Sequence, residues 1–446
     1  MVITDQRKRE ILNADVVVVG GGAAGVSTAV TAARQGLDVV LLERYGFCGG
    51  AAVAGLSGTI CGMYATREKT SAPPEQIVFG FAAEFTDLLQ SRGGVTGPVR
   101  YGKTFTRVHE PLVWREAADH LLAEAGVRVI FHAVVTDVLL EGRCRVAGVE
   151  AYTKQGRVQV RASLTVDASG DADLIAMSGF STSKGRDGFV QNPTMIFRLA
   201  GVEMERFLTF RGVDSILGAQ VSEAIVKANA EGKYYLPRSK IFLFTTPRDG
   251  ELLCNVTRVI GGDGRELDPL DARDLSEAES EGRRQVREYA RFLRDSVPGC
   301  EDSYVNDTGV QVGIRQSRQA VGLETLTNSD VMNCRKRNDG IALSAWPIEL
   351  HTGTRPYLQW LINDYYEIPF GSFVPLKSDG ILVAGRCLSA EHEAMASARV
   401  TAQCFSYGQA IGHAAAMSVK DAIPTSAIQG DNIRLLLNRD GARLDG

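Results

Sequence analysis

Three glycines near the start of the chain have the spacing of a phosphate-binding turn. Gly20, Gly22 and Gly25 form a G-x-G-x-x-G pattern directly after an apolar run that follows Asp15. In such a turn the first glycine lets the chain leave a strand sharply, the second allows the backbone to approach a pyrophosphate, and the third lets helix and sheet pack closely. The free N–H groups and the dipole of the following helix supply the anion site. The pattern therefore predicts binding of a dinucleotide.

An acidic residue closes the same unit. Residues 15–43 are typical of a strand, a tight turn, an Ala-rich helix and a parallel strand, which is the length of one βαβ unit. Glu43, at the tip of the second strand, is placed to accept hydrogen bonds from both ribose hydroxyls. A carboxylate there disfavours a 2′-phosphate, so NADP is not expected. The alternative is a Gly-rich turn of an ordinary α/β protein, but the flanking strands, the helix and the terminal Glu agree with a nucleotide site.

Candidate catalytic residues are found far along the chain. His351 could act as a general acid/base or as a substrate anchor, because histidine titrates near neutrality, although a lone histidine is more often structural. Four arginines could bind an anionic substrate or shuttle protons, and they could equally join two parts of the fold through ion pairs. They are Arg258, Arg315, Arg318 and Arg355. We take His351, Arg315 and Arg258 as the candidate catalytic residues.

Composition limits the class of protein. The formal charge of −4 on 446 residues gives no field for binding nucleic acid, and no Lys/Arg run suggests a membrane surface. Residues 1–14 are charged and lack the apolar core of a signal peptide, which predicts a cytoplasmic location. The eight cysteines contain no C-x-x-C pair, so neither a disulfide framework nor a metal site is expected, and most should be buried thiols.

The remaining pattern predicts an α/β fold with two parts. Residues 134–142, 145–153 and 156–164 alternate like the strands of a β-meander, and a separate parallel strand is predicted over 164–167. A long charged helix is predicted over 275–295, opened by a capping box at Ser276 and Glu279. An Ala/Gly-rich helix over 397–417 is apolar on nearly all sides and should be buried.

Several stretches together resemble the FAD-dependent oxidoreductases of the glutathione-reductase-like superfamily, and more closely the bacterial group akin to fumarate reductase flavoproteins. They are residues 20–52, 123–135, 166–174, 313–318, 347–351 and 380–416. The resemblance spans nearly the whole chain. It implies a Rossmann-like FAD-binding domain with a β-meander, plus an inserted α+β substrate domain. The expected division is 10–185 and 365–425 for the FAD-binding domain, 190–345 for the insert and 426–446 for a C-terminal helix and tail.

The resemblance also implies how FAD would lie. The glycine turn would face the pyrophosphate, and Gly49 and Gly50 the flavin side. Arg386 stands where related enzymes have an acid beside the ribityl chain. Arg399 and Val400 would open the last helix, whose dipole would favour the anionic reduced flavin at N1 and C2=O. The expected FAD contacts are Gly20, Gly22, Ala23, Ala24, Gly25, Glu43, Arg44, Gly49, Gly50, Ala51, Val135, Ala168, Ser169, Gly170, Gly385, Arg386, Arg399 and Val400.

The expected function is transfer of a hydride between a small organic substrate and flavin N5, of the dehydrogenase or reductase type. An anionic substrate is one option, since an arginine serves fumarate reductases in this way. The alternatives are a flavin-dependent monooxygenase and a non-catalytic, FAD-stabilised subunit of an electron-transfer complex. The sequence leaves open the substrate, the direction of the reaction, the electron donor or acceptor, and homo-oligomer formation.

Overall fold

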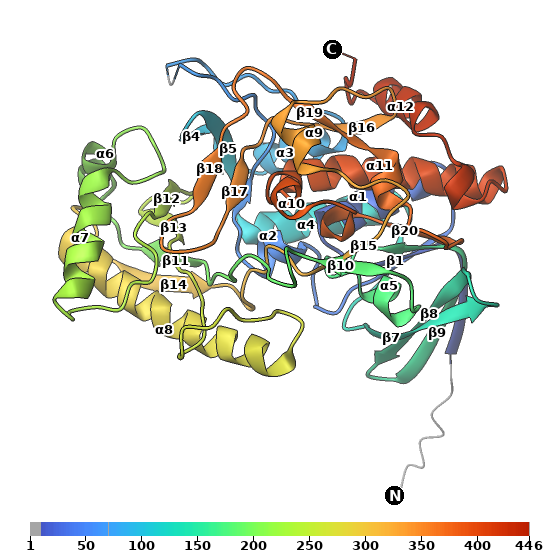
Figure 1. Ribbon diagram of the computed structural model, residues 1–446, viewed down its shortest axis with the longest axis horizontal. Coiled ribbons are helices and arrows are strands. Elements are labelled where there is room, and N and C mark those ends of the chain that lie inside the picture. The colour runs from blue at the N-terminus through green and yellow to red at the C-terminus, as the bar shows by residue number, and fades with distance from the viewer. Residues whose placement is uncertain (1–9, 70, 446) are drawn as a thin grey trace, which may run out of the picture.

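A seven-stranded sheet carries the glycine turn (Figure 1). The computed structural model describes residues 10–69 and 71–445, and the strand order is β6-β2-β1-β9-β8-β7, with β20 also paired to β9. The strands are β1 (Glu10–Val19), β2 (Val39–Leu42), β6 (Arg128–Ile130), β7 (Val134–Glu141), β8 (Arg145–Thr153), β9 (Gly156–Asp167) and β20 (Ile381–Val383). β6, β2, β1, β9 and β20 run parallel. The predicted α/β class with a parallel sheet is confirmed.

Strand β9 corrects the predicted meander. The third meander strand and the parallel strand over 164–167 are one continuous strand of 12 residues, Gly156–Asp167. Residues 156–161 pair antiparallel with β8, and residues 158–167 pair parallel with β1. No strand ends at Leu164, because the pairing with β1 continues through that residue and extends the strand to Asp167.

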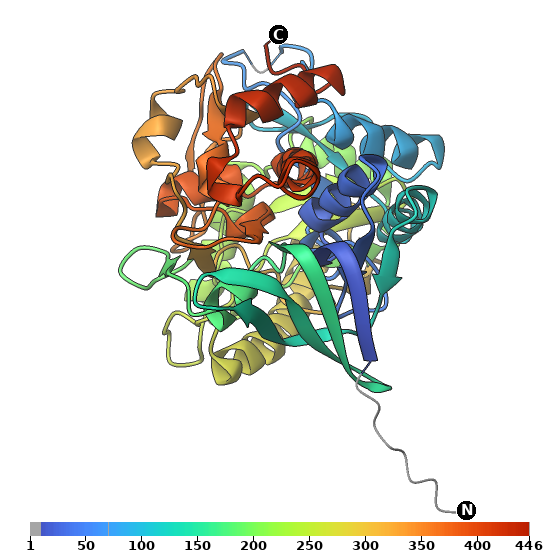
Figure 2. The same cartoon turned by 90° about the vertical axis from the view of Figure 1, so that its right-hand side faces the viewer.

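Helices α1 (Ala23–Arg34) and α11 (Thr401–Lys420) lie side by side on one face of the sheet (Figure 2). Their backbones come close because α11 presents glycines to α1. A Cβ on Gly408 would lie 2.3 Å from the Ala24 carbonyl oxygen, and one on Gly412 would lie 2.5 Å from the Thr31 Cβ. The Ser27 hydroxyl also donates to the Phe405 carbonyl oxygen. The helix that follows the glycine turn is therefore fixed against the last long helix.

The predicted helix over 397–417 begins at Thr401, with Val400 as its N-cap, which agrees with the expected opening at Arg399 and Val400; residues 397–398 belong to a separate helix. α10 (His392–Ala398) ends before Arg399, and α11 begins after Val400, whose backbone is extended at φ −79° and ψ 164°. No Pro or Gly marks the break, so the apolar pattern runs through it. The consequence is that a true helix N-terminus is exposed at residue 401.

Further elements cover this sheet. The helices are α2 (Gly50–Val53), α3 (Phe81–Ser91), α4 (Pro111–Glu124), α5 (Asp173–Met177) and α12 (Gly430–Arg439). A small sheet is formed by β3 (Thr59–Ile60), β5 (Thr104–Val108) and β4 (Val99–Tyr101). Pro111 is the first helical residue of α4, where its missing N–H is no loss.

A second hydrophobic core lies at the other end of the molecule (Figure 1, left). Its sheet has the order β12-β13-β11-β14, formed by Phe242–Thr245, Glu251–Asn255, Phe197–Ala200 and Tyr304–Thr308. It packs with α6 (Met204–Arg211), α7 (Ala219–Ala230) and α8 (Ala272–Ser296). The capping box expected at Ser276 is wrong: Asp271 caps α8 by accepting from the N–H groups of Arg273 and Asp274, so the helix starts one turn earlier.

Most of the remaining short elements contribute side chains to the first core. The remaining elements are β10 (Thr182–Lys184), β15 (Arg318–Ala320), α9 (Asn328–Met332), β16 (Gly340–Ser344), β17 (Ile348–Leu350), β18 (Tyr357–Gln359) and β19 (Tyr366–Pro369). A third group of buried apolar side chains includes Leu56, Tyr101, Phe242 and Trp346. The hairpin of β17 and β18 carries Glu349 and leads into His351.

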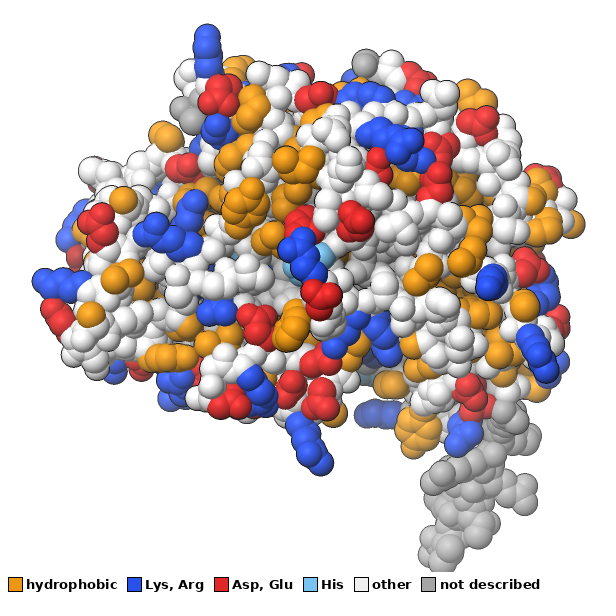
Figure 3. All heavy atoms as spheres, in the orientation of Figure 1, with side chains coloured by type: hydrophobic (Ala, Val, Ile, Leu, Met, Phe, Trp, Pro, Cys, Tyr) orange, Lys and Arg blue, Asp and Glu red, His pale blue; other side chains and the backbone are white. Residues whose placement is uncertain are grey.

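Charges of both signs are interspersed over the face shown in Figure 3, without a large patch of one sign. Within residues 10–69 and 71–445, no helix combines the length and the apolar character that crossing a membrane requires. Residues 1–9, most of the segment on which the predicted location rests, lie outside the described residues.

Candidate functional site

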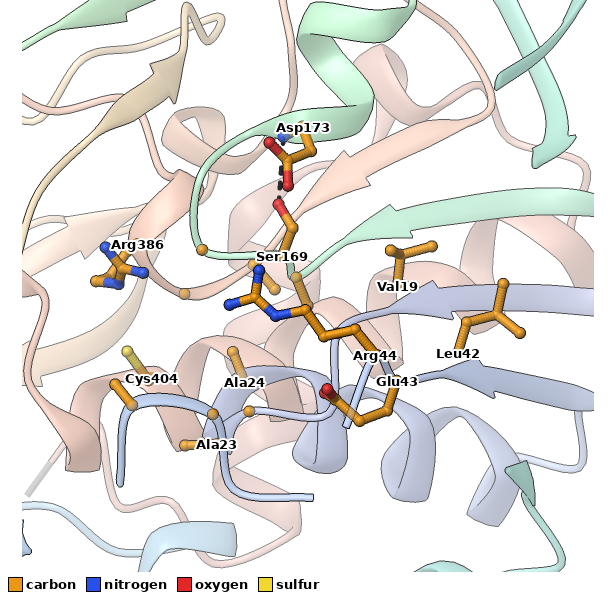
Figure 4. A pocket seen from close by; sticks show the side chains of 18 of the residues that line it. Val19, Ala23, Ala24, Leu42, Glu43, Arg44, Ser169, Asp173, Arg386 and Cys404 are labelled. Carbon is orange, nitrogen blue, oxygen red and sulfur yellow. Dashed lines mark hydrogen bonds between the residues drawn. The ribbon is translucent and has the colours of Figure 1, made fainter. Parts of the chain in front are cut away.

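A cavity with about 1150 Å³ of empty space opens where β1, β9 and β20 end and where α1 and α11 begin (Figure 4). All the predicted FAD contacts except Gly25 and Val400 line it. Residues from six separate stretches of the chain meet there, because the carboxyl ends of parallel strands lie at one edge of a sheet. Lining residues that the sequence did not single out are Val19, Leu42, Tyr45, Ala52, Ala133, Val134, Asp173, Leu174, Met177, Ala384, Thr401 and Cys404.

The glycine turn leaves part of the cavity wall as bare backbone. Gly20 has a φ of +101°, and a Cβ there would lie 2.5 Å from the Ala168 carbonyl oxygen. A Cβ on Gly25 would lie 1.8 Å from the Gly20 carbonyl oxygen, so Gly25 serves the packing of α1 on the strand end. A Cβ on Gly50 would lie 2.9 Å from the Gly22 Cα. The two glycine segments thus pack against each other so closely that a side chain at Gly50 would not fit, and their main chain lines the cavity.

Glu43, at the tip of β2, stabilises this turn through hydrogen bonds. Its carboxylate accepts hydrogen bonds from the backbone N–H of Gly21 at 2.6 Å and of Tyr45 at 2.9 Å. The side chain is buried, and this burial raises the pKa of the carboxyl group, although the two hydrogen bonds oppose the rise. Glu43 therefore lines the cavity and at the same time fixes the shape of the glycine turn.

Arginines give the cavity a positive rim. Figure 4 shows the Arg44 side chain extending toward Ser169, with Arg386 further along the cavity. The Arg386 Nη1 is buried and has no hydrogen-bond partner among the described residues, and its Nη2 lies 3.6 Å from an Asp171 carboxylate oxygen. A buried guanidinium with a free donor is suited to an anion such as a diphosphate.

The loop after β9 is held by its own acidic groups. The Asp167 carboxylate accepts from the Ser169 hydroxyl at 2.6 Å and from the Leu174 N–H at 2.9 Å. Burial raises the pKa of Asp173 to about 6, helped by the negative charges of Asp171 and Asp167. Arg318 forms an ion pair with Asp173 at 2.7 Å, so this arginine holds the loop.

A second, narrower chamber brings the three candidate catalytic residues together. Its cavity volume is about 10 Å³, room for about one water, and it is lined by Asn192, Arg238, Thr257, Arg258, Arg315, His351, Gly353 and Pro356. His351 comes from the β17–β18 hairpin, Arg258 follows β13, and Arg315 precedes β15. Arg355 is exposed instead. The sequence did not identify Arg238, which lies in a loop with no motif around it.

A carboxylate orients the histidine. The His351 Nε2 lies 2.8 Å from the Glu349 Oε1, and the Tyr101 hydroxyl donates to the same oxygen at 3.0 Å. Burial lowers the pKa of His351 well below its usual value, and the charge of Arg315 lowers it further. The pKa of Glu349 is also lowered: burial opposes its ionisation, but His351, Arg399 and Arg315 outweigh that effect. Near neutral pH the pair is a carboxylate and a neutral imidazole whose Nε2–H donates.

Arg399 connects the chamber to the first cavity. It lines the first cavity, while its Nη2 lies 3.4 Å from the Gln191 Oε1 and 3.4 Å from the Glu349 carbonyl oxygen. The Gln191 Oε1 also accepts from the His351 N–H at 3.2 Å. The two spaces are therefore neighbours across Gln191 and Arg399.

Comparison with known proteins agrees with this arrangement. A family model described as FAD dependent oxidoreductase matches residues 15–437. No curated protein sequence matches the chain.

Solved structures provide a likeness of fold. A geranylgeranyl bacteriochlorophyll reductase-like protein from Thermoplasma acidophilum is 14% identical, over 96% of this chain and 83% of that one, with a TM-score of 0.50. p-Nitrophenol 4-monooxygenase from Pseudomonas putida DLL-E4 is 12% identical, over 97% of this chain and 87% of that one, with a TM-score of 0.49. At such identities the likeness concerns the fold alone.

Proposed function

Because the chain belongs to the FAD-dependent oxidoreductase family and its cofactor is FAD, we propose that it transfers a hydride between a small organic substrate and flavin N5. The observation that carries this proposal is the buried His351 and Glu349 pair in a chamber adjoining the cavity of the glycine turn. Bound FAD would supply the hydride chemistry, while the chain supplies position and charge. The motifs at 313–318 and 347–351 support a place in the fumarate-reductase-flavoprotein-like group.

The residues of the first cavity fit FAD. A Cβ on Gly22 would have only the Gly50 Cα within 4 Å, at 3.8 Å, so the main chain at Gly22 is open, which suits the diphosphate. Arg386 offers its Nη1, which has no hydrogen-bond partner among the described residues, and the N-terminus of α11 at Thr401 offers a positive dipole. Arg44 and Glu43 would serve the adenosine ribose, and Val135 the adenine.

His351 would move the proton. An ionised Glu349 can only accept hydrogen bonds, so the proton of neutral His351 is on Nε2 and its Nδ1 is the acceptor. The Nδ1 of His351 would take a proton from a substrate hydroxyl or amine during oxidation, or return it during reduction. Arg315 and Arg258, in the same chamber, would hold the substrate. We also propose that the inserted part, 190–345, covers the substrate.

The test is anaerobic addition of candidate metabolites to the purified, FAD-loaded protein. Loss of the yellow flavin absorbance with formation of the oxidised product is expected. A second arm adds oxygen to the reduced protein with substrate present: incorporation of an atom of labelled oxygen into the product would favour the monooxygenase alternative. A protein that does not retain FAD, or a flavin that no donor reduces, would overturn the proposal and favour the non-catalytic alternative.

A further inference from the structure

The side chain of Arg44 crosses the glycine turn. Strands β2, β1 and β9 are neighbours in the sheet and run parallel, so the segments that follow them lie side by side at one edge. Arg44 follows β2, the glycine turn follows β1, and Ser169 follows β9. Figure 4 shows the Arg44 side chain extending toward Ser169. A side chain that extends from the end of β2 toward the end of β9 must pass over the end of β1, where a diphosphate would meet the turn.

A glutamine distant in sequence holds this side chain. The Arg44 Nη2 donates to the Gln311 Oε1 at 3.0 Å, and the Tyr45 hydroxyl donates to the same oxygen. Because a guanidinium has no acceptor, the oxygen of the Gln311 amide must face it. Arg44 and Tyr45 both line the first cavity, and Gln311 does not. One amide oxygen outside the cavity wall therefore joins two residues of that wall.

The main chain at Gln311 is anchored on both cores. Its N–H donates to the Ala54 carbonyl oxygen at 3.2 Å, and a Cβ on Gly309 would lie only 3.2 Å from that same oxygen. The next residue, Val312, is buried in the second core, and its N–H donates to the Glu279 carboxylate of α8 at 2.8 Å. The segment between β14 and β15 thus presents the Gln311 amide from a fixed position.

The two donors differ in freedom. The Tyr45 ring stacks on Phe47, with centroids 5.4 Å apart and planes at 7°, and the Arg115 guanidinium lies 4.2 Å from the centre of the Phe47 ring. Tyr45 is half-buried, whereas Arg44 is exposed and its guanidinium lies 5.1 Å from the centre of the Tyr45 ring. Tyr45 is therefore the fixed partner of Gln311, and Arg44 is the one that can swing aside.

We propose that the Arg44 side chain is a strap that closes over the adenosine diphosphate part of FAD, and that the Gln311 amide is the latch that holds this strap closed. Gln311 is then a positioning residue, which acts on the cofactor through Arg44 and Tyr45 without touching it. The inference rests on FAD as the cofactor and on no step of the proposed hydride transfer. Its measurable consequence is the rate at which FAD leaves the protein.

The experiment measures release from the purified protein by stopped-flow fluorescence, with FAD and ADP as the probes. ADP has the same adenosine and diphosphate as FAD, and it is displaced by excess FAD. Gln311→Ala should release both probes roughly two- to tenfold faster, the factor that corresponds to the loss of one hydrogen bond. Gln311→Glu keeps an acceptor for both donors and should release them at the wild-type rate or more slowly. Unchanged release in Gln311→Ala, or release from Gln311→Glu as fast as from Gln311→Ala, would overturn the inference.

A double variant tests whether Gln311 acts through Arg44. Arg44→Met removes the strap and should speed release at least as much as Gln311→Ala does. When the two substitutions are combined, the rate should rise by clearly less than the product of the two separate factors, because both disrupt the same contact. Effects that multiply in full would mean that Gln311 acts by another route and would overturn the assignment.

Gln359→Ala is the matched control. The Gln359 Oε1 also accepts from a tyrosine hydroxyl, that of Tyr357 at 3.0 Å, but neither residue lines the first cavity. This variant should release FAD and ADP like the wild type. Faster release from it, to the same extent as from Gln311→Ala, would show that any lost contact of this kind speeds release, and the latch would be refuted.

Discussion

The Oε1 of Glu349 lies 2.8 Å from the Nε2 of His351 and 3.0 Å from the hydroxyl of Tyr101, so one carboxylate oxygen orients two buried proton-bearing groups. Tyr101 is itself fixed by stacking on Trp346, with ring centroids 5.3 Å apart and planes at 9°. The imidazole therefore has a defined tautomer and little freedom to rotate. This arrangement makes His351 the residue on which the proposed proton transfer depends.

Replacement of His351 by Ala should leave FAD bound and slow flavin reduction. Loss of a general acid/base costs roughly 10²- to 10⁴-fold in rate. Stopped-flow measurement of flavin absorbance under anaerobic conditions, once a substrate is known, gives the value. Glu349→Gln is the companion variant: it should keep FAD and shift the pH dependence of reduction, because the amide no longer fixes the tautomer. Wild-type reduction kinetics in His351→Ala would refute the assigned role.

Substitutions at two glycines of the turn should have different effects: one should prevent FAD binding, and the other should destabilise the fold. Gly22 has an ordinary φ of −72° and its Cβ would have only the Gly50 Cα within 4 Å, at 3.8 Å. Gly22→Val should therefore fold normally and fail to retain FAD. Gly25→Ala should instead destabilise the fold by about 1–3 kcal/mol, because its Cβ would meet the Gly20 carbonyl oxygen. Absorbance of the purified protein and urea unfolding measure the two effects, and a yellow Gly22→Val protein would contradict the first.

Arg386 should contribute to cofactor affinity through charge. A hydrogen bond to a charged group contributes about 1.5–3 kcal/mol, so Arg386→Met should weaken FAD binding by roughly ten- to a hundredfold. The salt dependence of the dissociation constant should become shallower as well. Arg386→Lys keeps the charge and should recover part of both effects. Titration of FAD into the apoprotein at several ionic strengths measures them, and an unchanged salt dependence would rule out contact with the diphosphate.

His109 should make the protein sensitive to acid. Burial lowers its pKa from 6.5 to about 3, and the positive charge of Arg198 adds to the shift. At pH values above the pKa of His109 in the unfolded chain, the imidazole is neutral in both the folded and the unfolded protein. Below it the unfolded chain takes up a proton that the folded chain excludes, so stability falls by about 1.4 kcal/mol for each pH unit between roughly 6.5 and 3.

His109→Phe tests this directly. Neither ring nitrogen of His109 has a hydrogen-bond partner among the described residues, and the ring lies 4.5 Å from that of Trp114, so phenylalanine can replace it without breaking a bond. Urea unfolding at pH 7, 6 and 5 should show a smaller loss of stability in the variant. Parallel curves for the two proteins would mean that His109 does not cause the loss.

The residues that line the first cavity could be predicted because they belong to local patterns. Gly20 and Gly22 come directly after a buried strand, and Gly385 follows another, so the parallel sheet alone places them at one edge. Around the chamber, His351, Arg315 and Arg258 could be singled out by residue type, but their neighbours have no such pattern. Tyr101 and Arg238 lie on separate segments that meet Glu349 only through the tertiary fold, and no local spacing marks them.

Two boundaries were missed for a similar reason. The break between α10 and α11 is marked by neither Pro nor Gly, and Val400, the N-cap of α11, packs in the apolar group that includes Leu56 and Trp346. Strand β9 runs on past Leu164 because β1 pairs with it over residues 158–167. In both cases contacts distant in sequence override the local signal.

Arg399 lines the first cavity, and its Nη2 lies 3.4 Å from both the Gln191 Oε1 and the Glu349 carbonyl oxygen, so this residue stands between that cavity and His351. A charge in the cavity therefore changes the electrostatic potential at the His351 and Glu349 pair. Thermodynamic reciprocity then requires that a substrate bound beside His351 alter the affinity for FAD by the same factor by which FAD alters the affinity for that substrate. Cofactor saturation in a cell would accordingly follow the supply of the substrate.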